Sequence, residues 1–352
     1  MRTIDLTIHD IAFGGKGVAR DGAKAIFVPF VIEGEYVSAR IVREKKQFAE
    51  AELVKVLEAS PHRVAAPCPY FGRCGGCSYQ HISYEQQLAL KQKQVEQAMR
   101  RIAKLTDPPM RSIVPSPLPY SYRNRITVHV EEGVIGFYRR DAHELMDIVQ
   151  CPISLRQVND ALTQLRATKP ADGHYTLRAH SGPRVFAQTN DAVADAMADF
   201  IDSLLPSEHE LLVDAFCGAG FFAKRLAPKF EKIVGIDWDR FAIDAARKEA
   251  GPNESYVAGD VAVELAGALR TSSSLIVDPP ATGLSPEMRR AILDSPPQTM
   301  IYVSCNPPTL ARDLAELQAQ FSVVSITPFD MFPQTAEIEV VTHLEGRPPC
   351  RP

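Results

Sequence analysis

The chain has 352 residues, of which 45% are hydrophobic and 23% charged, and its net charge is −4. This is the composition of an ordinary globular protein, long enough for two or three domains with a sizeable core. No run of 18 apolar residues occurs, and residues 1–5 contain no apolar signal core. We therefore expect neither a membrane span nor secretion, and a cytoplasmic location.

The charge is distributed unevenly along the chain. Residues 1–125 contain 19 Lys and Arg against 12 Asp and Glu, a net of +7, and the other residues carry a net of −11. Such an asymmetry can place a polyanionic partner on the N-terminal part, although chance clustering on a solvated surface explains it equally well. Seven cysteines in a cytoplasmic chain favour metal binding or catalysis over a disulfide framework.

Residues 1–58 have the pattern of a small β-barrel. Short strand-like runs are separated by turns at close spacing, and basic residues gather on one strand and turn at 40–46. Barrels of this kind often bind single-stranded or irregular RNA, but many of them are purely structural. The pattern resembles the TRAM domain, an RNA-binding module attached to RNA-modifying enzymes.

Three cysteines follow within one short loop, at Cys68, Cys74 and Cys77. Two glycines after Cys74 supply backbone freedom where larger side chains would crowd a ligand set. A fourth thiolate is available at Cys151, which is isolated in the sequence. Zinc and an iron–sulfur cluster both accept four thiolates, and the spacing does not decide between them.

The stretch up to residue 185 predicts a helix and an antiparallel sheet. Residues 85–104 place apolar side chains at roughly helical spacing, and their C-terminal end is basic. Residues 122–130 and 134–140 flank a Glu-Glu-Gly turn, which predicts a β-hairpin. Arginines interleave with tyrosines along it, which suits phosphate contact and base stacking but equally suits a solvated sheet face. These residues are Arg123, Arg125, Arg139, Arg140, Tyr122 and Tyr138.

From about residue 186 the pattern changes to alternating strands and helices. Repeated β-α units predict a parallel, doubly wound sheet. The last two strand-like runs, at 321–327 and 336–344, have no helix between them and predict an antiparallel hairpin at the edge of the sheet. We therefore expect three domains: a barrel at 1–58, a central domain at 59–185 and an α/β domain at 186–352.

Several of the α/β strands end in glycines or acids, at the edge where such sheets bind ligands. Gly218 and Gly220 let the backbone approach a ligand closely, but Ala223 stands where a dinucleotide motif has its third glycine. Asp237 closes the second strand and can accept hydrogen bonds from two ribose hydroxyls. Asp260 closes the third strand and can meet an adenine edge. These ends in series fit S-adenosylmethionine better than a dinucleotide.

Two further strand ends carry reactive groups. Asp278 begins an Asp-Pro-Pro sequence after the fourth strand, where it can hold a flat base edge or cap a helix. Cys305 follows an apolar run and precedes Asn306 and a pair of prolines. A thiol at a strand end is a candidate nucleophile, and the alternative is a small buried hydrophobic residue.

Together these motifs resemble the uracil-C5 RNA methyltransferases that modify 23S ribosomal RNA and tRNA. The resemblance spans nearly the whole chain, and its motifs occur in family order. The most specific are Ser-Cys-Asn-Pro at 304–307 and Asp-Met-Phe-Pro-Gln-Thr at 330–335. The resemblance implies a class I S-adenosylmethionine-dependent methyltransferase fold with a TRAM barrel, which is OB-like, and a central α+β iron–sulfur domain.

The resemblance also implies roles for individual residues. Cys305 matches the family nucleophile, and Glu339 matches the general base. The residues that match the family's methyl-donor contacts are Gln188, Phe216, Asp237, Asp260 and Asp278. The four cysteines match the ligands of a 4Fe–4S cluster, which we expect ahead of zinc: Cys68, Cys74, Cys77 and Cys151.

The reaction requires these residue types because uracil C5 is a poor nucleophile. A thiolate that adds at C6 creates an enolate whose C5 can attack a methyl sulfonium. A base must then remove the C5 proton so that the thiol can leave. The target base must also be extruded from its stack.

Four positions depart from the family pattern. Ala281 stands where the family usually has Arg, Phe221 replaces an Asn in the glycine turn, and Asp237 replaces a Glu. Glu337 replaces a His two residues before Glu339. Because residues two apart on a strand share a face, we expect two neighbouring carboxylates there, of which one has a raised pKa.

We expect 23S ribosomal RNA as the substrate, tRNA as the second choice, and a monomeric enzyme. Two other functions stay open. An amino-methyltransferase would use Asp278 around an exocyclic nitrogen and would need no cysteine nucleophile. A non-catalytic RNA-binding protein with a structural metal would bind no methyl donor.

Overall fold

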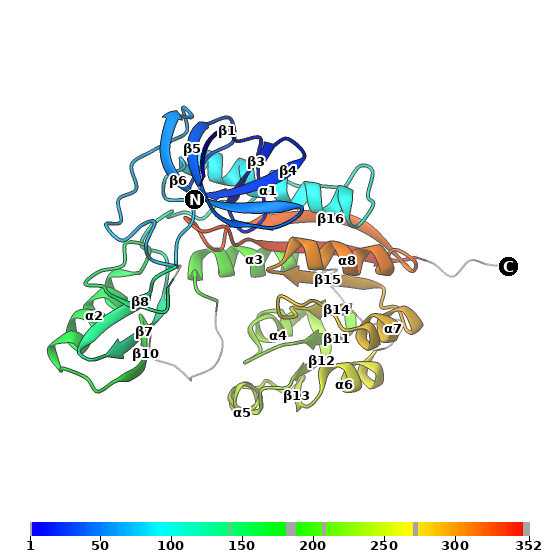
Figure 1. The fold of residues 1–352 in the computed structure, drawn as a ribbon. Coiled ribbons are helices and arrows are strands. Elements are labelled where there is room, and N and C mark those ends of the chain that lie inside the picture. Colours follow the sequence, from blue (N-terminus) through cyan, green and yellow to red (C-terminus); the bar gives the residue numbers. More distant parts are fainter. Residues whose placement is uncertain (1, 141, 181–187, 206–208, 270–273, 348–352) are drawn as a thin grey trace. The chain divides into compact units, whose positions relative to one another are not determined.

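The computed structural model describes residues 2–140, 142–180, 188–205, 209–269 and 274–347. The chain forms two compact units (Figure 1). The first consists of Met1–Gln94, Ser116–Ser181 and Phe332–Glu337, and the second of Val95–Pro115, Gly182–Met331 and Ile338–Pro352. The predicted boundary at residues 185 and 186 lies outside the described residues, and the division into three domains stays a prediction.

The first unit begins with a six-stranded sheet in the order β1-β5-β6-β4-β3-β2. Backbone bonds from Ile8 N to Glu35 O (2.9 Å) and from His9 N to Val18 O (2.8 Å) join the segment between β1 and β2 to the rest of the sheet. Alternate residues such as Ile26 face a common apolar core. The strands are β1 (Thr3–Thr7), β2 (Asp10–Ile11), β3 (Lys16–Asp21), β4 (Lys24–Pro29), β5 (Tyr36–Glu44) and β6 (Phe48–Glu58).

A second sheet of the first unit has four antiparallel strands in the order β10-β7-β8-β9. The predicted hairpin is confirmed as the pair of β7 (Arg125–Glu131) and β8 (Val134–Tyr138). The other strands are β9 (Leu145–Asp147) and β10 (Gly173–Arg178). Helix α2 (Arg156–Ala167) covers one face, where its Val158 and Leu162 share a core with Ile126 and Val128 of β7.

The predicted helix at 85–104 is α1 (Tyr84–Arg101). Its Gln87 side chain accepts a hydrogen bond from Gln334 N and donates to Gln334 Oε1, both at 3.0 Å. Gln334 O in turn accepts from Ser78 N and Tyr79 N. Gln334 has φ +70°, so its backbone is held in a conformation that few non-glycine residues adopt. The Pro-Gln-Thr stretch therefore organises the backbone of the first unit.

The second unit contains a seven-stranded sheet in the order β13-β12-β11-β14-β15-β17-β16, which can be followed from bottom to top in Figure 1. The first five of these strands are parallel. β17 runs antiparallel between β15 and β16, so the predicted edge hairpin is confirmed. The strands are β11 (His209–Ala215), β12 (Phe230–Asp237), β13 (Glu254–Ala258), β14 (Ser274–Val277), β15 (Thr299–Ser304), β16 (Phe321–Phe329) and β17 (Glu339–Gly346).

Polar residues cap the N-termini of several helices of the second unit. Asn190, Asp239, Asp260, Ser285 and Asn306 are N-caps whose side chains accept backbone N–H groups. The helices are α3 (Asp191–Leu204), α4 (Phe221–Leu226), the 3₁₀ turn η1 (Ala227–Lys229), α5 (Arg240–Lys248), α6 (Val261–Ala268), α7 (Pro286–Asp294) and α8 (Pro307–Leu317).

One large apolar core holds the second unit together. It contains Tyr302 of β15, Leu310 and Leu314 of α8, and Val95 and Met99 from the C-terminal half of α1. Because β15 is buried along its whole length, the segment that carries Cys305 starts from a rigid base. Among the described residues, no helix is long and apolar enough to cross a membrane.

Candidate functional site

Cys305 lies between the end of β15 and the start of α8, at the carboxyl edge of the parallel strands. The preceding Ser304 hydroxyl accepts a hydrogen bond from Asn306 N (3.2 Å), and Asn306 Oδ1 accepts from Thr309 N (3.2 Å). Pro307 occupies the first helical position, where its missing N–H costs nothing. Cys305 therefore stands at the N-terminus of an 11-residue helix, whose dipole favours a thiolate.

The register of β15 and β17 brings the candidate nucleophile and base together. Ser304 pairs with Val340 across the antiparallel ladder. Cys305 directly follows Ser304, and Glu339 directly precedes Val340, so the two residues flank the last pair of the ladder at the same end. Glu339 is only 6% exposed, which suits a base that works away from water.

The expectation that Glu337 and Glu339 lie on one strand and share a face is wrong. Glu337 lies before β17, and its backbone N–H donates to Thr335 Oγ1 (3.1 Å) in a local turn. This turn interrupts the extended conformation that would have placed the two carboxylates on one face. Glu337 is exposed, whereas Glu339 is buried, so the two glutamates have different environments.

The backbone after β11 bends sharply, as the glycine turn predicts. Phe216, Gly218 and Gly220 have φ values of +66°, +54° and +84°. A Cβ atom at Gly220 would lie 2.6 Å from the Tyr256 hydroxyl, so no larger residue fits there without movement. Phe221, the departure from the family pattern, opens α4 and is 41% exposed.

Asp237 and Asp260 both lie where the sequence predicts them, but their carboxylates also have structural partners. Asp237 Oδ2 accepts a hydrogen bond from Gly218 N (2.8 Å), and Oδ1 accepts from Asp239 N (2.8 Å). Asp237 thus fixes the glycine turn beside it. Asp260 is exposed and caps α6, with its Oδ1 accepting from Ala262 N (2.8 Å).

Asp278 is not a helix cap, because the next helix is capped by Ser285. Its backbone N–H donates to Ala215 O (3.3 Å) at the end of β11. Burial and the nearby Asp237 carboxylate raise the pKa of Asp278. Burial raises the pKa of Asp214, on the adjacent β11, to about 8. Asp278 therefore retains its proton at higher pH than an exposed Asp does.

Gln188 lies two residues before Asn190, the N-cap of α3, and it is half-buried. The preceding Phe186 and Ala187 lie outside the described residues. Asn190 Nδ2 donates to Met331 O (3.3 Å), which joins the start of α3 to the segment after β16.

Motif reasoning did not identify one buried carboxylate close to this site. Asp313 of α8 is 0% exposed and accepts hydrogen bonds from the Tyr302 hydroxyl (2.7 Å), Leu284 N (2.9 Å), Arg289 (3.1 Å) and Arg312 (2.7 Å). It thereby ties β15 and the loop that follows Asp278 to α8. A sequence signal existed, because an Asp three residues after Leu310 lies on the apolar stripe of the helix.

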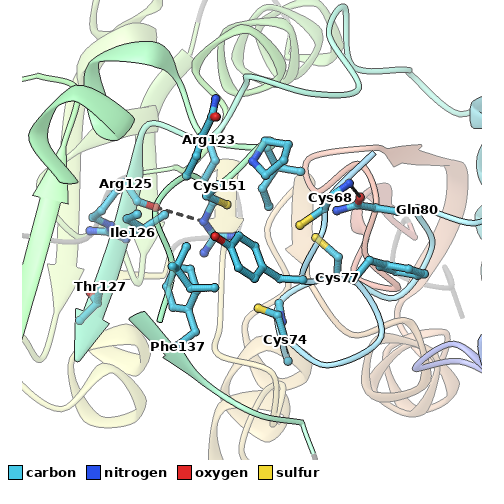
Figure 2. A pocket seen from close by; sticks show the side chains of 18 of the residues that line it. Cys68, Cys74, Cys77, Gln80, Arg123, Arg125, Ile126, Thr127, Phe137 and Cys151 are labelled. Atoms are coloured by element: carbon cyan, nitrogen blue, oxygen red, sulfur yellow. Dashed lines mark hydrogen bonds between the residues drawn. The ribbon is translucent and has the colours of Figure 1, made fainter. Parts of the chain in front are cut away.

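The four predicted cysteine ligands line one pocket of the first unit, with a volume of about 610 Å³. Cys68, Cys74 and Cys77 stand together on one wall, and Cys151 comes from the side that carries Arg123 (Figure 2). All four thiols are free. Burial, together with the other three cysteines, raises the pKa of Cys77 to about 12.

The donor set suits a thiolate-bound metal group, since a cation would favour the charged form of these buried thiols. Within the described part of the chain, no three His, Cys, Asp or Glu side chains converge closely enough to hold one metal ion.

Comparison with known proteins adds independent evidence. Two family models match the chain, the TRAM domain over residues 1–54 and tRNA (Uracil-5-)-methyltransferase over residues 267–347. An uncharacterized RNA methyltransferase of Gloeobacter violaceus is 30% identical, over 98% of this chain and 96% of its own length. Another from Aquifex aeolicus is 29% identical, over 98% of this chain and 99% of its own.

A solved structure matches the whole fold. The tRNA (uracil-54, C5)-methyltransferase of Pyrococcus abyssi, in complex with S-adenosyl-L-homocysteine, superposes with a TM-score of 0.73 at 23% identity. The match covers 97% of this chain and 100% of that one.

The seven-stranded sheet with its terminal hairpin and the N-terminal TRAM domain define a class I S-adenosylmethionine-dependent methyltransferase fold. The chain belongs to the TRAM-containing uracil-C5 RNA methyltransferase family and is an S-adenosylmethionine-dependent RNA (uracil-5-)-methyltransferase. The expected class I fold with its TRAM domain and the expected enzyme class are thus confirmed, whereas the central iron–sulfur domain stays a prediction.

Proposed function

We propose that the enzyme methylates a uracil in structured RNA through a covalent bond between Cys305 Sγ and uracil C6, and that Glu339 removes the C5 proton. One observation carries this proposal. The last pair of the β15–β17 ladder is Ser304 and Val340, so Cys305 and Glu339 lie next to this pair at the edge where Asp237 ends β12 and Asp278 follows β14. Nucleophile, base and donor-site acids therefore lie at one edge of one sheet.

Each residue has a defined task in this reaction. The Cys305 thiolate, favoured by the α8 N-terminus, adds to C6 and makes C5 nucleophilic. S-adenosylmethionine supplies the methyl group that C5 takes. Glu339 then accepts the C5 proton, and the bond between Cys305 and C6 breaks. Each carboxyl oxygen of Asp278 can accept a hydrogen bond from the base edge, and in the protonated form one of them can donate.

We propose that Gln188, Phe216, Asp237, Asp260 and Asp278 contact the methyl donor. The positive φ of Phe216 supports its part, because it turns the backbone at the carboxyl end of β11. Asp260 uses one carboxylate oxygen to cap α6, so its second oxygen is available to accept a hydrogen bond from the adenine. Asp237 can accept ribose hydroxyls at the second lone pairs of its two oxygens.

For the RNA we propose 23S ribosomal RNA first and tRNA second. The tRNA alternative is supported by the Pyrococcus abyssi enzyme, which acts on uracil 54 of tRNA and shares the fold. Mass mapping of total RNA from a deletion strain and its parent separates the two, because the missing methyl group identifies the molecule and the nucleotide.

The role of Glu339 is tested by trapping. In Glu339→Gln the C5 proton stays, so a covalent RNA–protein adduct should accumulate after methyl transfer. Glu337→Gln is the matched control, and it should release its product as the wild type does. Accumulation only in Glu337→Gln would contradict the assignment. Full activity of Cys305→Ala would support an amino-methyltransferase instead.

We also propose that Cys68, Cys74, Cys77 and Cys151 hold a 4Fe–4S cluster. Their common pocket and their free thiols support one shared thiolate-bound group, and the family resemblance favours a cluster over a zinc ion. Such a cluster would join the loop of the first three cysteines to the segment of Cys151 and stabilise the first unit. Anaerobically purified protein should be brown and contain iron. Stoichiometric zinc without iron would contradict the proposal.

A further inference from the structure

The outer face of the four-stranded sheet in the first unit has an unusual pattern of side chains. The register of β7 and β10 sets identical residues directly opposite each other at three successive alternate positions, which point to the same face of the sheet. The intervening residues of both strands face the core with α2. We name the outer set the cross-strand ladder. It consists of the pairs Arg125 and Arg178, Thr127 and Thr176, and His129 and His174.

The rings of the ladder pack against those of neighbouring elements. The His129 and His174 ring centroids are 4.6 Å apart. Tyr138 of β8 lies beside His129, with centroids 4.5 Å apart, and His143 stacks on Tyr138 at 4.4 Å and 13°. The Tyr138 hydroxyl donates to Glu131, which fixes the position of its ring. The face thus offers a group of partly exposed aromatic rings.

The other end of the ladder is strongly basic. Arg125 and Arg178 line the cysteine pocket together with Arg123, and Glu337 is the one acidic residue among the pocket's lining side chains in the described chain. Like charges directly opposite each other on a sheet are destabilising. Burial, Arg178 and Arg123 lower the pKa of Arg125, which reflects the same repulsion. An anion bound between these guanidinium groups would relieve it.

The middle of the ladder connects the two ends. The Thr127 and Thr176 hydroxyls are hydrogen-bonded at 3.0 Å, and both threonines line the pocket with Tyr138. The four residue steps from Arg125 to His129 span about 13 Å along the strand. Over this length the surface changes from guanidinium groups to hydroxyls and then to rings. These groups match the phosphate, ribose and base of a nucleotide chain.

We propose that the cross-strand ladder binds a single-stranded segment of the substrate RNA, with phosphate at Arg125 and Arg178 and bases stacked on Tyr138, His129 and His174. The proposal rests on the chain's membership of the RNA methyltransferases and names a surface outside the methyl-transfer site. Charge complementarity selects a polyanion, and the exposed rings select one with unpaired bases. A duplex hides its base faces and would gain only the arginine contacts.

The test measures binding of a fluorescein-labelled oligouridylate to the full-length protein without methyl donor. Arg178→Gln should weaken binding about tenfold and reduce the slope of log Kd against log salt by about 1. His174→Ala should weaken binding about five- to tenfold through lost stacking, with an unchanged salt slope. Arg156→Gln is the matched control, because Arg156 lies on α2, which covers the opposite face, and is paired with Asp160.

Folding and catalysis are checked separately. The melting temperature of Arg178→Gln should stay within about 2 °C of the wild type, because Gln keeps a polar side chain at this partly exposed position. Wild-type affinity in both ladder variants, or equal binding of duplex RNA, would overturn the ladder and leave the methyl-transfer mechanism untouched. If both variants weaken RNA binding as predicted but the wild-type enzyme forms no adduct at Cys305, the ladder is supported and the proposed mechanism is contradicted.

Discussion

The buried carboxylate of Asp313 allows a sharp prediction about the scaffold behind Cys305. Asp313→Ala removes the acceptor for the Tyr302 hydroxyl and Leu284 N and leaves the guanidinium of Arg289, a residue only 8% exposed, without its buried partner. Breaking a buried ion pair from one side costs about 3–5 kcal/mol. For a protein of this size we expect the melting temperature to fall by about 10 °C.

Glu316→Ala is the matched control, because Glu316 binds the same Arg289 at 2.8 Å but its side chain is 52% exposed. An exposed ion pair contributes less than about 1 kcal/mol, so this variant should melt within about 2 °C of the wild type. Thermal unfolding followed by circular dichroism measures both. Hydrogen exchange should accelerate in β15 and in the loop after Asp278 in Asp313→Ala alone.

The same comparison has a functional consequence. Because Asp313 ties β15 to the loop that follows Asp278, Asp313→Ala should lower kcat as well as stability, whereas Glu316→Ala should leave kcat unchanged. Equal melting temperatures for the two variants would refute the reasoning that burial decides the value of these ion pairs. A stable Asp313→Ala protein with normal kcat would refute the link to the active site.

Three further predictions concern other parts of the chain. Burial lowers the pKa of His81 from 6.5 to about 4, so its contribution to stability is complete above pH 6.5 and falls by roughly 3 kcal/mol as the pH drops towards 4. Melting curves at a series of pH values should show a weaker pH dependence in His81→Phe, and an unchanged dependence would contradict this role of His81. Trp238, the single tryptophan, follows Asp237 and is 75% exposed, so its fluorescence emission should change when S-adenosylmethionine binds, and Asp237→Ala should bind about tenfold more weakly. Constant emission at saturating S-adenosylmethionine would argue against a methyl-donor site at Asp237. Gly220→Ala should cost about 1–3 kcal/mol, because φ is +84° and the new Cβ meets Tyr256; a variant as stable as the wild type in urea unfolding would show that the turn is not constrained.

Much of the second unit could be predicted from its sequence because local patterns there have simple physical causes. Buried parallel strands give continuous apolar runs, and the turns after them need glycine or a capping Asp or Asn. The run at 299–304 and its cap at Asn306 place Cys305 without any structure. The absence of a helix between the last two strands likewise predicted the antiparallel hairpin.

Contacts between distant residues could not be predicted in this way. The bonds between Gln87 and Gln334 join residues far apart in sequence, so no periodicity reveals them. Asp313 looked like one more polar helical residue until its four partners were known. The cross-strand ladder depends on the register of β7 with β10, and a shift of one residue would have faced its side chains into the core.

The local turn at Glu337 shows how a short-range bond can defeat a periodicity argument. Residues two apart share a face only on a continuous strand. The bond from Glu337 N to Thr335 Oγ1 ends that continuity, so the predicted pair of carboxylates does not form at Glu339. A Thr hydroxyl can accept a hydrogen bond from the backbone N–H two residues on, and this local bond competes with an extended strand.

The covalent step at Cys305 is tested most directly with RNA that contains 5-fluorouridine. Fluorine at C5 cannot be removed as a proton, so the enzyme should stay attached after methyl transfer. Transcripts of 23S ribosomal RNA and tRNA are incubated with enzyme and S-adenosylmethionine, and the product is examined by intact mass and peptide mapping. We expect an adduct of protein, RNA and one methyl group that maps to Cys305 and is absent in Cys305→Ser. Methylation of the natural RNA without any such adduct, or an adduct at another cysteine, would contradict the mechanism.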